Sequence, residues 1–176
     1  VNIKTVPGGG TTKLFYNQLD MPVMTIDNNS NKIITKYDIL KRPIVTGDYE
    51  GNQLPNNSQP GISFYENIDG AQTYDYTLNN SFPTDAASEL EIHSVTYYDD
   101  YNTDNTGGDE FPYIAPPTSD YESSPSVWTR NLPTATRTGI LDENGRTSTS
   151  DFLNEAIFYD DRGRVIQTQK TSHIGG

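Results

Sequence analysis

Residues 155–168 read EAIFYDDRGRVIQT and contain the pattern of a complete β-hairpin. A β-rich run ends at Tyr159, a turn rich in Asp and Gly follows, and a second β-rich run begins at Val165. Two β-rich runs joined by a short Asp/Gly segment favour two antiparallel strands. The pattern therefore predicts a hairpin that turns between Tyr159 and Val165.

The same frame occurs earlier in the chain. Residues 16–25 read YNQLDMPVMT and residues 37–46 read YDILKRPIVT. Both begin with Tyr and then Asn or Asp, have Leu in the fourth place, and continue with Pro, two apolar residues and Thr. Residues 98–101 read YDDY and start the frame once more. Such self-similarity is typical of arrays of stacked repeats.

Turn chemistry explains each residue of this frame. Asp or Asn can cap a turn by accepting hydrogen bonds from backbone N–H groups, and Gly supplies a positive φ angle. The Tyr ring can pack on the neighbouring hairpin. Because one hairpin cannot bury its apolar face alone, several have to stack. We therefore expect an all-β fold of antiparallel hairpins that form an open, twisted sheet segment with long irregular loops.

The frame resembles the Tyr-Asp-x-x-Gly-Arg signature of the Rhs/YD-repeat family. The residues that carry the resemblance are Tyr16, Tyr37, Asp38, Arg42, Tyr98, Asp99, Tyr159, Asp160, Gly163 and Arg164. Residues 159–164 match the signature fully, whereas Lys41 and Asp20 stand where the family has Gly.

Longer blocks look like successive parts of the large Rhs-like surface proteins of Bacteroidetes. They are residues 35–43, 95–101, 132–138 and 158–175. The resemblance implies a secreted or cell-surface bacterial protein whose repeats form a continuous sheet that spirals into a hollow shell. This chain would be a structural, non-catalytic segment of the wall. Its implied partners are neighbouring repeats of the same longer polypeptide and an enclosed C-terminal effector.

The chain divides into four parts on this interpretation. We expect a linker at residues 1–13, β segments of the YD-repeat type at residues 14–100 and 127–176, and a loop insertion at residues 101–126. A run of glycine at residues 8–10 indicates the linker. Frequent Pro and Gly indicate that the insertion lies on the surface.

Composition excludes several classes of protein. The formal net charge is −12, so the Lys/Arg footprint that nucleic-acid binding requires is missing. The sequence has no apolar run of about 18 residues, so we expect no membrane span. Cysteine is absent, which excludes disulfides and thiolate ligands. The 12 tyrosines argue for a folded chain with a thin core, because Tyr can bury its ring and keep its hydroxyl hydrogen-bonded.

An oxygen-rich run lies at the start of the insertion. Asp100, Asn102 and Asp104 offer the carboxylate and amide oxygens that Ca²⁺ prefers. An EF-hand would need Gly at Asn105 and Glu at Phe111, so the run is not an EF-hand. A weak calcium site and a solvated acidic loop are the two interpretations, and calcium is the one candidate cofactor.

No catalytic arrangement is predicted, and we expect that the protein is not an enzyme. Adjacent carboxylates such as Asp160 and Asp161 would point to opposite faces of a strand, so we interpret them as turn caps. His93 and His173 are the two histidines, and no nucleophile motif accompanies them.

Trp128 is the one tryptophan of the chain. A lone Trp usually packs, so we expect it to anchor the insertion as a buried side chain. With Tyr121 and Arg130 nearby, it could instead stack on a sugar. The alternative function is therefore an extracellular carbohydrate- or calcium-dependent binding module.

Overall fold

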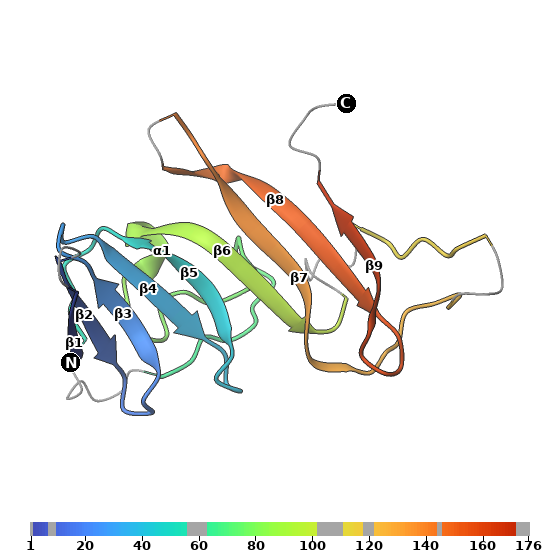
Figure 1. Cartoon of the computed structure of the whole chain (residues 1–176), viewed down its shortest axis with the longest axis horizontal. Helices are drawn as coiled ribbons and strands as arrows, with labels where there is room; N and C mark the ends of the chain where they lie inside the picture. Colours follow the sequence, from blue (N-terminus) through green and yellow to red (C-terminus); the bar gives the residue numbers. More distant parts are fainter. Residues whose placement is uncertain are drawn as a thin grey trace.

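The protein is built on one open antiparallel β-sheet (Figure 1). The computed structural model describes residues 2–6, 10–55, 63–101, 111–117, 122–143 and 146–171. The nine strands of these residues follow one another in the sheet in the order of the chain. The predicted all-β class with an open, twisted sheet is therefore confirmed.

The sheet begins and ends with strands that pair on one side only. The elements are β1 Asn2–Val6, β2 Gly10–Tyr16, β3 Pro22–Ile26, β4 Lys32–Tyr37, β5 Pro43–Tyr49, α1 Ala86–Glu89, β6 Leu90–Asp99, β7 Thr129–Leu141, β8 Thr147–Tyr159 and β9 Val165–Lys170.

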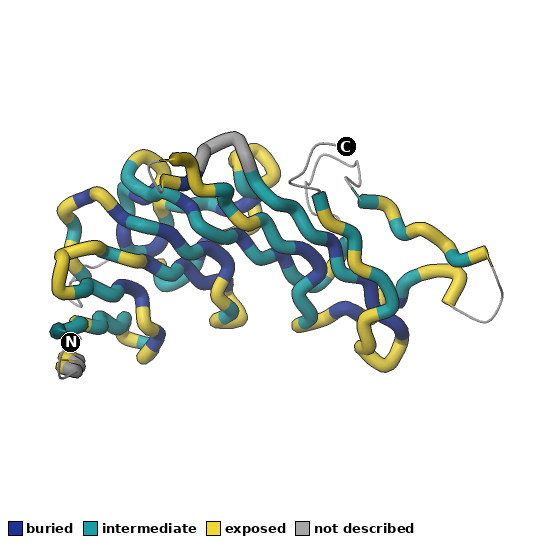
Figure 2. Tube along the Cα trace, turned by 45° about the horizontal axis from the view of Figure 1, so that its top comes forward, coloured by how far each residue is buried: buried dark blue, intermediate teal, exposed yellow. Residues whose placement is uncertain are grey.

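One face of the sheet is apolar and covered. Its buried side chains include Met24, Ile34, Val45, Val95 and Ala135, which come from five successive strands. The connection between β5 and β6 packs on this face, and Figure 1 shows it in cyan and green across the sheet. Figure 2 shows buried positions along the strands and exposed positions at the turns.

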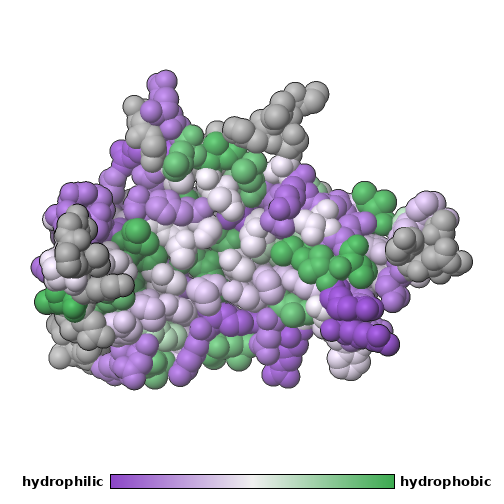
Figure 3. All heavy atoms as spheres, in the orientation of Figure 1, coloured by the Kyte–Doolittle hydropathy of each residue, from purple (hydrophilic) through white to green (hydrophobic). Residues whose placement is uncertain are grey.

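The other face is rich in hydroxyl groups. Thr35 lies opposite Thr46, Thr46 opposite Ser94, and Ser94 opposite Thr138. The hydroxyls of Thr46 and Ser94 are hydrogen-bonded at 2.8 Å. Figure 3 shows mostly pale, near-neutral colours across the middle of the molecule, with apolar side chains in separate patches. A sheet that buries one face explains how so polar a chain can fold.

A buried ion pair holds the β5–β6 connection on the sheet. The Nζ of Lys36 lies 3.0 Å from Oε1 of Glu66, and both side chains are 0% exposed. The ammonium also donates to the carbonyl oxygens of Leu78, Ser81 and Pro83 at 2.8, 2.9 and 2.7 Å. Burial lowers the pKa of Lys36 to about 8, and the charge of Glu66 opposes that shift. Because a buried charge needs partners, this contact sets where the connection can lie.

One of the expected divisions of the chain, the linker, is wrong. Residues 2–6 and 10–13 are not a linker but belong to β1 and β2. Thr5 pairs with Thr11 across the two strands, and β-branched residues suit a pleated surface. Within the expected β segment at residues 14–100, the described part of residues 50–89 is a long connection with isolated bridges and α1 and without a strand.

We expect Lys36→Met to lower the free energy of unfolding by about 3–5 kcal/mol, because Glu66 is then a buried charge without its partner. Urea unfolding followed by circular dichroism measures the change. The double variant Lys36→Met/Glu66→Gln removes both charges and should recover a large part of the loss. A single variant as stable as the original protein would contradict the assignment.

Candidate functional site: the junctions between hairpins

Several hairpins close with the same five-residue turn, which the β4–β5 turn illustrates. Oδ1 of Asp38 accepts hydrogen bonds from the backbone N–H groups of Leu40 and Arg42, both at 2.9 Å. The N–H of Lys41 donates to the carbonyl of Asp38 at 2.9 Å, and the N–H of Asp38 donates to the carbonyl of Arg42 at 3.0 Å. Lys41 has a φ of 65°. This is a type I turn followed by a bulge residue in the left-handed region.

The same cap recurs in three further turns. Asn17, Asp27 and Asp160 each accept, through Oδ1, from the N–H groups two and four residues later at 2.8–3.0 Å. The left-handed positions of these turns are held by Asp20, Ser30 and Gly163. Since only one of them is Gly, the property that the turns share is the capping side chain.

Sequence reasoning missed two turns of this kind. The β3–β4 turn starts at Asp27, which does not follow a tyrosine. In the β7–β8 turn, the N–H of Asp142 donates to the carbonyl of Arg146 at 2.7 Å, and the N–H of Arg146 donates to Oδ1 of Asp142 at 2.9 Å. Residues 142–146 read DENGR, so a search for Asp-x-x-Gly-Arg without Tyr would have found this turn.

A tyrosine hydroxyl joins each of three hairpins to the hairpin before it. The donors are Tyr37, Tyr98 and Tyr159, and the acceptors are the carbonyl oxygens of Pro22, Pro43 and Pro133, at 2.7, 3.0 and 2.6 Å. Each donor lies at the end of a hairpin's first strand, and each acceptor lies in the preceding return strand. Burial raises the pKa of all three tyrosines, so their hydroxyls stay protonated as donors.

An arginine adds an ionic link between β4–β5 and β6. Nη1 and Nη2 of Arg42 donate to the two carboxylate oxygens of Asp99, each at 2.7 Å. Nε of Arg42 donates to Oδ2 of Asp38 at 2.6 Å, and the guanidinium lies 4.3 Å from the ring centroid of Tyr98. The hydrogen bonds from Arg42 lower the pKa of Asp99. The bidentate pair stacked on a ring provides a geometrically specific contact between two hairpins.

The repeat-motif residues therefore have unequal roles. Asp38 and Asp160 cap the turns that they begin. Asp99 does not, because a long connection follows it; its Oδ1 accepts instead from the N–H of Asn131 at 2.7 Å. Tyr16 is partly buried and pairs with Pro22 in the sheet.

The prediction that Trp128 is a buried anchor is wrong. The residue is 77% exposed. The next residue, Thr129, is buried and pairs with Asp99 in the sheet. Trp128 directly precedes β7 and lies at the surface, while the buried contact at this point is made by Thr129.

The calcium hypothesis stays a prediction, because Asn102 and Asp104 lie outside the described residues. Asp100 is exposed beyond the end of β6. Within the described ranges, no group of three or more His, Cys, Asp or Glu side chains could hold a metal ion. Nε2 of His93 lies 3.1 Å from Oδ2 of Asp48, and His173 is outside the described residues.

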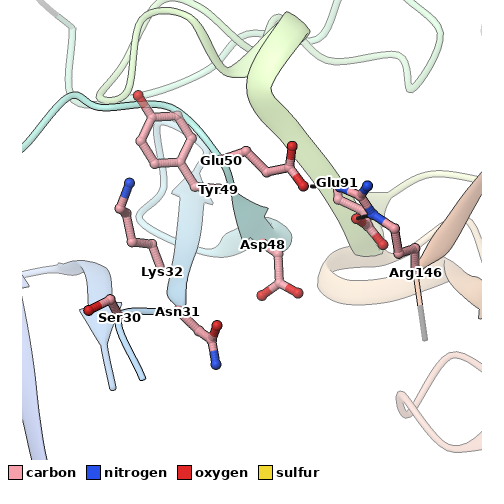
Figure 4. A pocket seen from close by; sticks show the side chains of 8 residues that line it. All are labelled: Ser30, Asn31, Lys32, Asp48, Tyr49, Glu50, Glu91 and Arg146. Carbon is pink, nitrogen blue, oxygen red and sulfur yellow. Dashed lines mark hydrogen bonds and ion pairs between the residues drawn. The ribbon is translucent and has the colours of Figure 1, made fainter. Parts of the chain in front are cut away.

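A polar pocket of about 480 Å³ lies where the β3–β4 turn, the end of β5, the start of β6 and Arg146 meet (Figure 4). Arg146 contacts Glu50, and its Nε lies 3.1 Å from Oε2 of Glu91. Lys32 lies 5.4 Å from the ring centroid of Tyr49. Arg146 thus ties the end of β5 to the start of β6 through two carboxylates.

Comparisons with known family models and with curated proteins find no match for this chain. In the part of the chain that the structure describes, no helix has the length and apolarity needed to cross a membrane.

Tyr159→Phe removes the hydrogen bond to Pro133 and keeps the ring in place. We expect a loss of about 1 kcal/mol in the free energy of unfolding, because a neutral hydrogen bond is removed at a partly buried site. Tyr65→Phe is the matched control, since the Tyr65 hydroxyl has no hydrogen-bond partner among the described residues. Urea unfolding of both variants tests this, and equal losses would argue against the junction.

Proposed function

We propose that this chain is a structural, non-catalytic wall segment of a longer secreted protein of the Rhs/YD-repeat type. The repeated junction carries the proposal. The β4–β5 and β8–β9 hairpins each combine a turn capped by Asp with a tyrosine hydroxyl that binds the preceding return strand, and Tyr98 makes the same hydroxyl contact without a capped turn. Each junction involves neighbours alone, so hairpins can be added in a row without any change in their chemistry.

The open ends of the sheet also support a role as part of a longer array. Both β1 and β9 pair on one side only in the described residues. A free strand edge offers backbone donors and acceptors to a further strand. Neighbouring repeats of the same bacterial cell-surface or secreted polypeptide would occupy these edges, and the shell they build would enclose an effector.

Removal of residues 144–176, which contain β8 and β9, tests the array. If each hairpin contacts only the hairpins next to it, removal of the last strands should lower the stability of the chain but leave the other strands folded. We therefore expect a lower melting temperature with the antiparallel signal retained in circular dichroism. Hydrogen exchange should show β3 and β4 as protected as in the full chain. Complete loss of structure would indicate a closed domain and contradict the proposal.

The exposure of Trp128 favours the second candidate, an extracellular carbohydrate- or calcium-dependent binding module, in its carbohydrate-binding form. Exposed aromatic side chains next to polar groups are common in binding surfaces.

Because the chain has one tryptophan, its tryptophan fluorescence reports on Trp128 alone. A binding module predicts a saturable change in this fluorescence on titration with soluble glycans, with or without millimolar calcium. Trp128→Ala removes the fluorescent reporter, so its glycan binding is measured by isothermal titration calorimetry; it should be abolished, whereas Val127→Ala should bind like the original protein. The wall segment predicts unchanged fluorescence throughout.

A further inference from the structure

The outer edge of β9 has the same arrangement of residues that binds β6 at the edge of β5, but no strand is bound there in the described part of the chain. Arg164 follows its turn as Arg42 follows the β4–β5 turn, and each donates through Nε to the Asp that caps its own turn, both at 2.6 Å. The side chain of Arg42, which also holds Asp99, is 17% exposed. The side chain of Arg164 is 67% exposed, and no second acidic partner is found for it among the described residues.

The backbone carbonyl of Val165 corresponds to that of Pro43 in the contact between β5 and β6. The register pairs Tyr159 with Val165 as it pairs Tyr37 with Pro43. In the filled junction, the carbonyl of Pro43 accepts the hydroxyl of Tyr98 at 3.0 Å. Val165 is 56% exposed, and its strand has no neighbour beyond it in the described part of the chain.

The segment at residues 111–117 leaves the backbone edge of β9 available. It is attached through the side chains of Gln167 and Gln169, which bond to Ile114 and Pro112 at 2.6–3.0 Å. Both glutamines lie opposite buried residues of β8, so they are on the covered face of the sheet.

We propose that the edge of β9 is a binding site for an antiparallel strand that ends in Tyr-Asp. The incoming tyrosine ring stacks on Arg164 and its hydroxyl donates to the carbonyl of Val165. The carboxylate of the following Asp accepts two hydrogen bonds from the guanidinium of Arg164. The proposal rests on the proposed function, because β6 of this chain is the model for the occupant. Arg164 determines specificity, since a neutral residue after the tyrosine cannot form the bidentate pair.

The test uses the full chain and a fluorescent peptide with the sequence of residues 90–100, LEIHSVTYYDD. Fluorescence anisotropy should show saturable binding. Asp99→Asn in the peptide should weaken the affinity about tenfold, because it removes a charged hydrogen-bond partner. Arg164→Gln in the protein should have a similar effect. Arg162→Gln makes the same change of charge at an exposed residue of the same turn and should retain full affinity.

The position of binding is measured by hydrogen exchange, in which the peptide should slow exchange in residues 165–170. The peptide variant leaves the protein unchanged, so its result does not depend on how well Arg164→Gln folds. No saturable binding, equal affinity for the Arg164 and Arg162 variants, or protection away from β9 would overturn the proposal. If removal of residues 144–176 leaves the remaining sheet folded and the peptide does not bind, the wall function stands and this site is rejected.

Discussion

The sheet depends on turns in which a side-chain oxygen of Asp or Asn accepts hydrogen bonds from backbone N–H groups of the same turn. In the β4–β5 turn, one carboxylate oxygen of Asp38 accepts hydrogen bonds from two backbone N–H groups. These bonds fix the number of residues between the two strands. A slip of one residue would move every side chain of a strand to the other face of the sheet. The capped turn therefore decides which residues face the core. It also decides whether a tyrosine meets the carbonyl of the preceding hairpin.

The acidic composition has a structural explanation at these turns. Carboxylates such as Asp38 and Asp160 accept backbone N–H groups and pair with arginine, and hydrogen bonds lower the pKa of Asp99, Asp160 and Asp27. Ionised acceptors of this kind form stronger hydrogen bonds than neutral ones. These carboxylates therefore have a structural role, and Glu50 and Glu91 follow the same principle because both contact Arg146.

The thin core requires the loops as well as the strands. The covered face has buried apolar side chains from Met24 to Ala135, and the sheet alone would leave them exposed to water. The β5–β6 connection covers it and is held there by Lys36 and Glu66. The far end has a smaller cover, in which the rings of Tyr101 and Tyr113 lie 5.0 and 5.4 Å from that of Phe158. Long connections are therefore parts of the core in this protein.

The sequence by itself determined the capped turns that follow Tyr16, Tyr37 and Tyr159, although it missed those at Asp27 and Asp142. A turn is a local structure, and the residues that cap it are neighbours in the chain, so the frames at Tyr16, Tyr37 and Tyr159 could be recognised directly. Only the tertiary structure decided that Lys36 is buried, that Trp128 is exposed, and that residues 2–6 form a strand. It also decided that Arg42 binds Asp99, 57 positions away. Such contacts depend on which strands become neighbours, and the order and register of strands arise from the packing of the whole sheet.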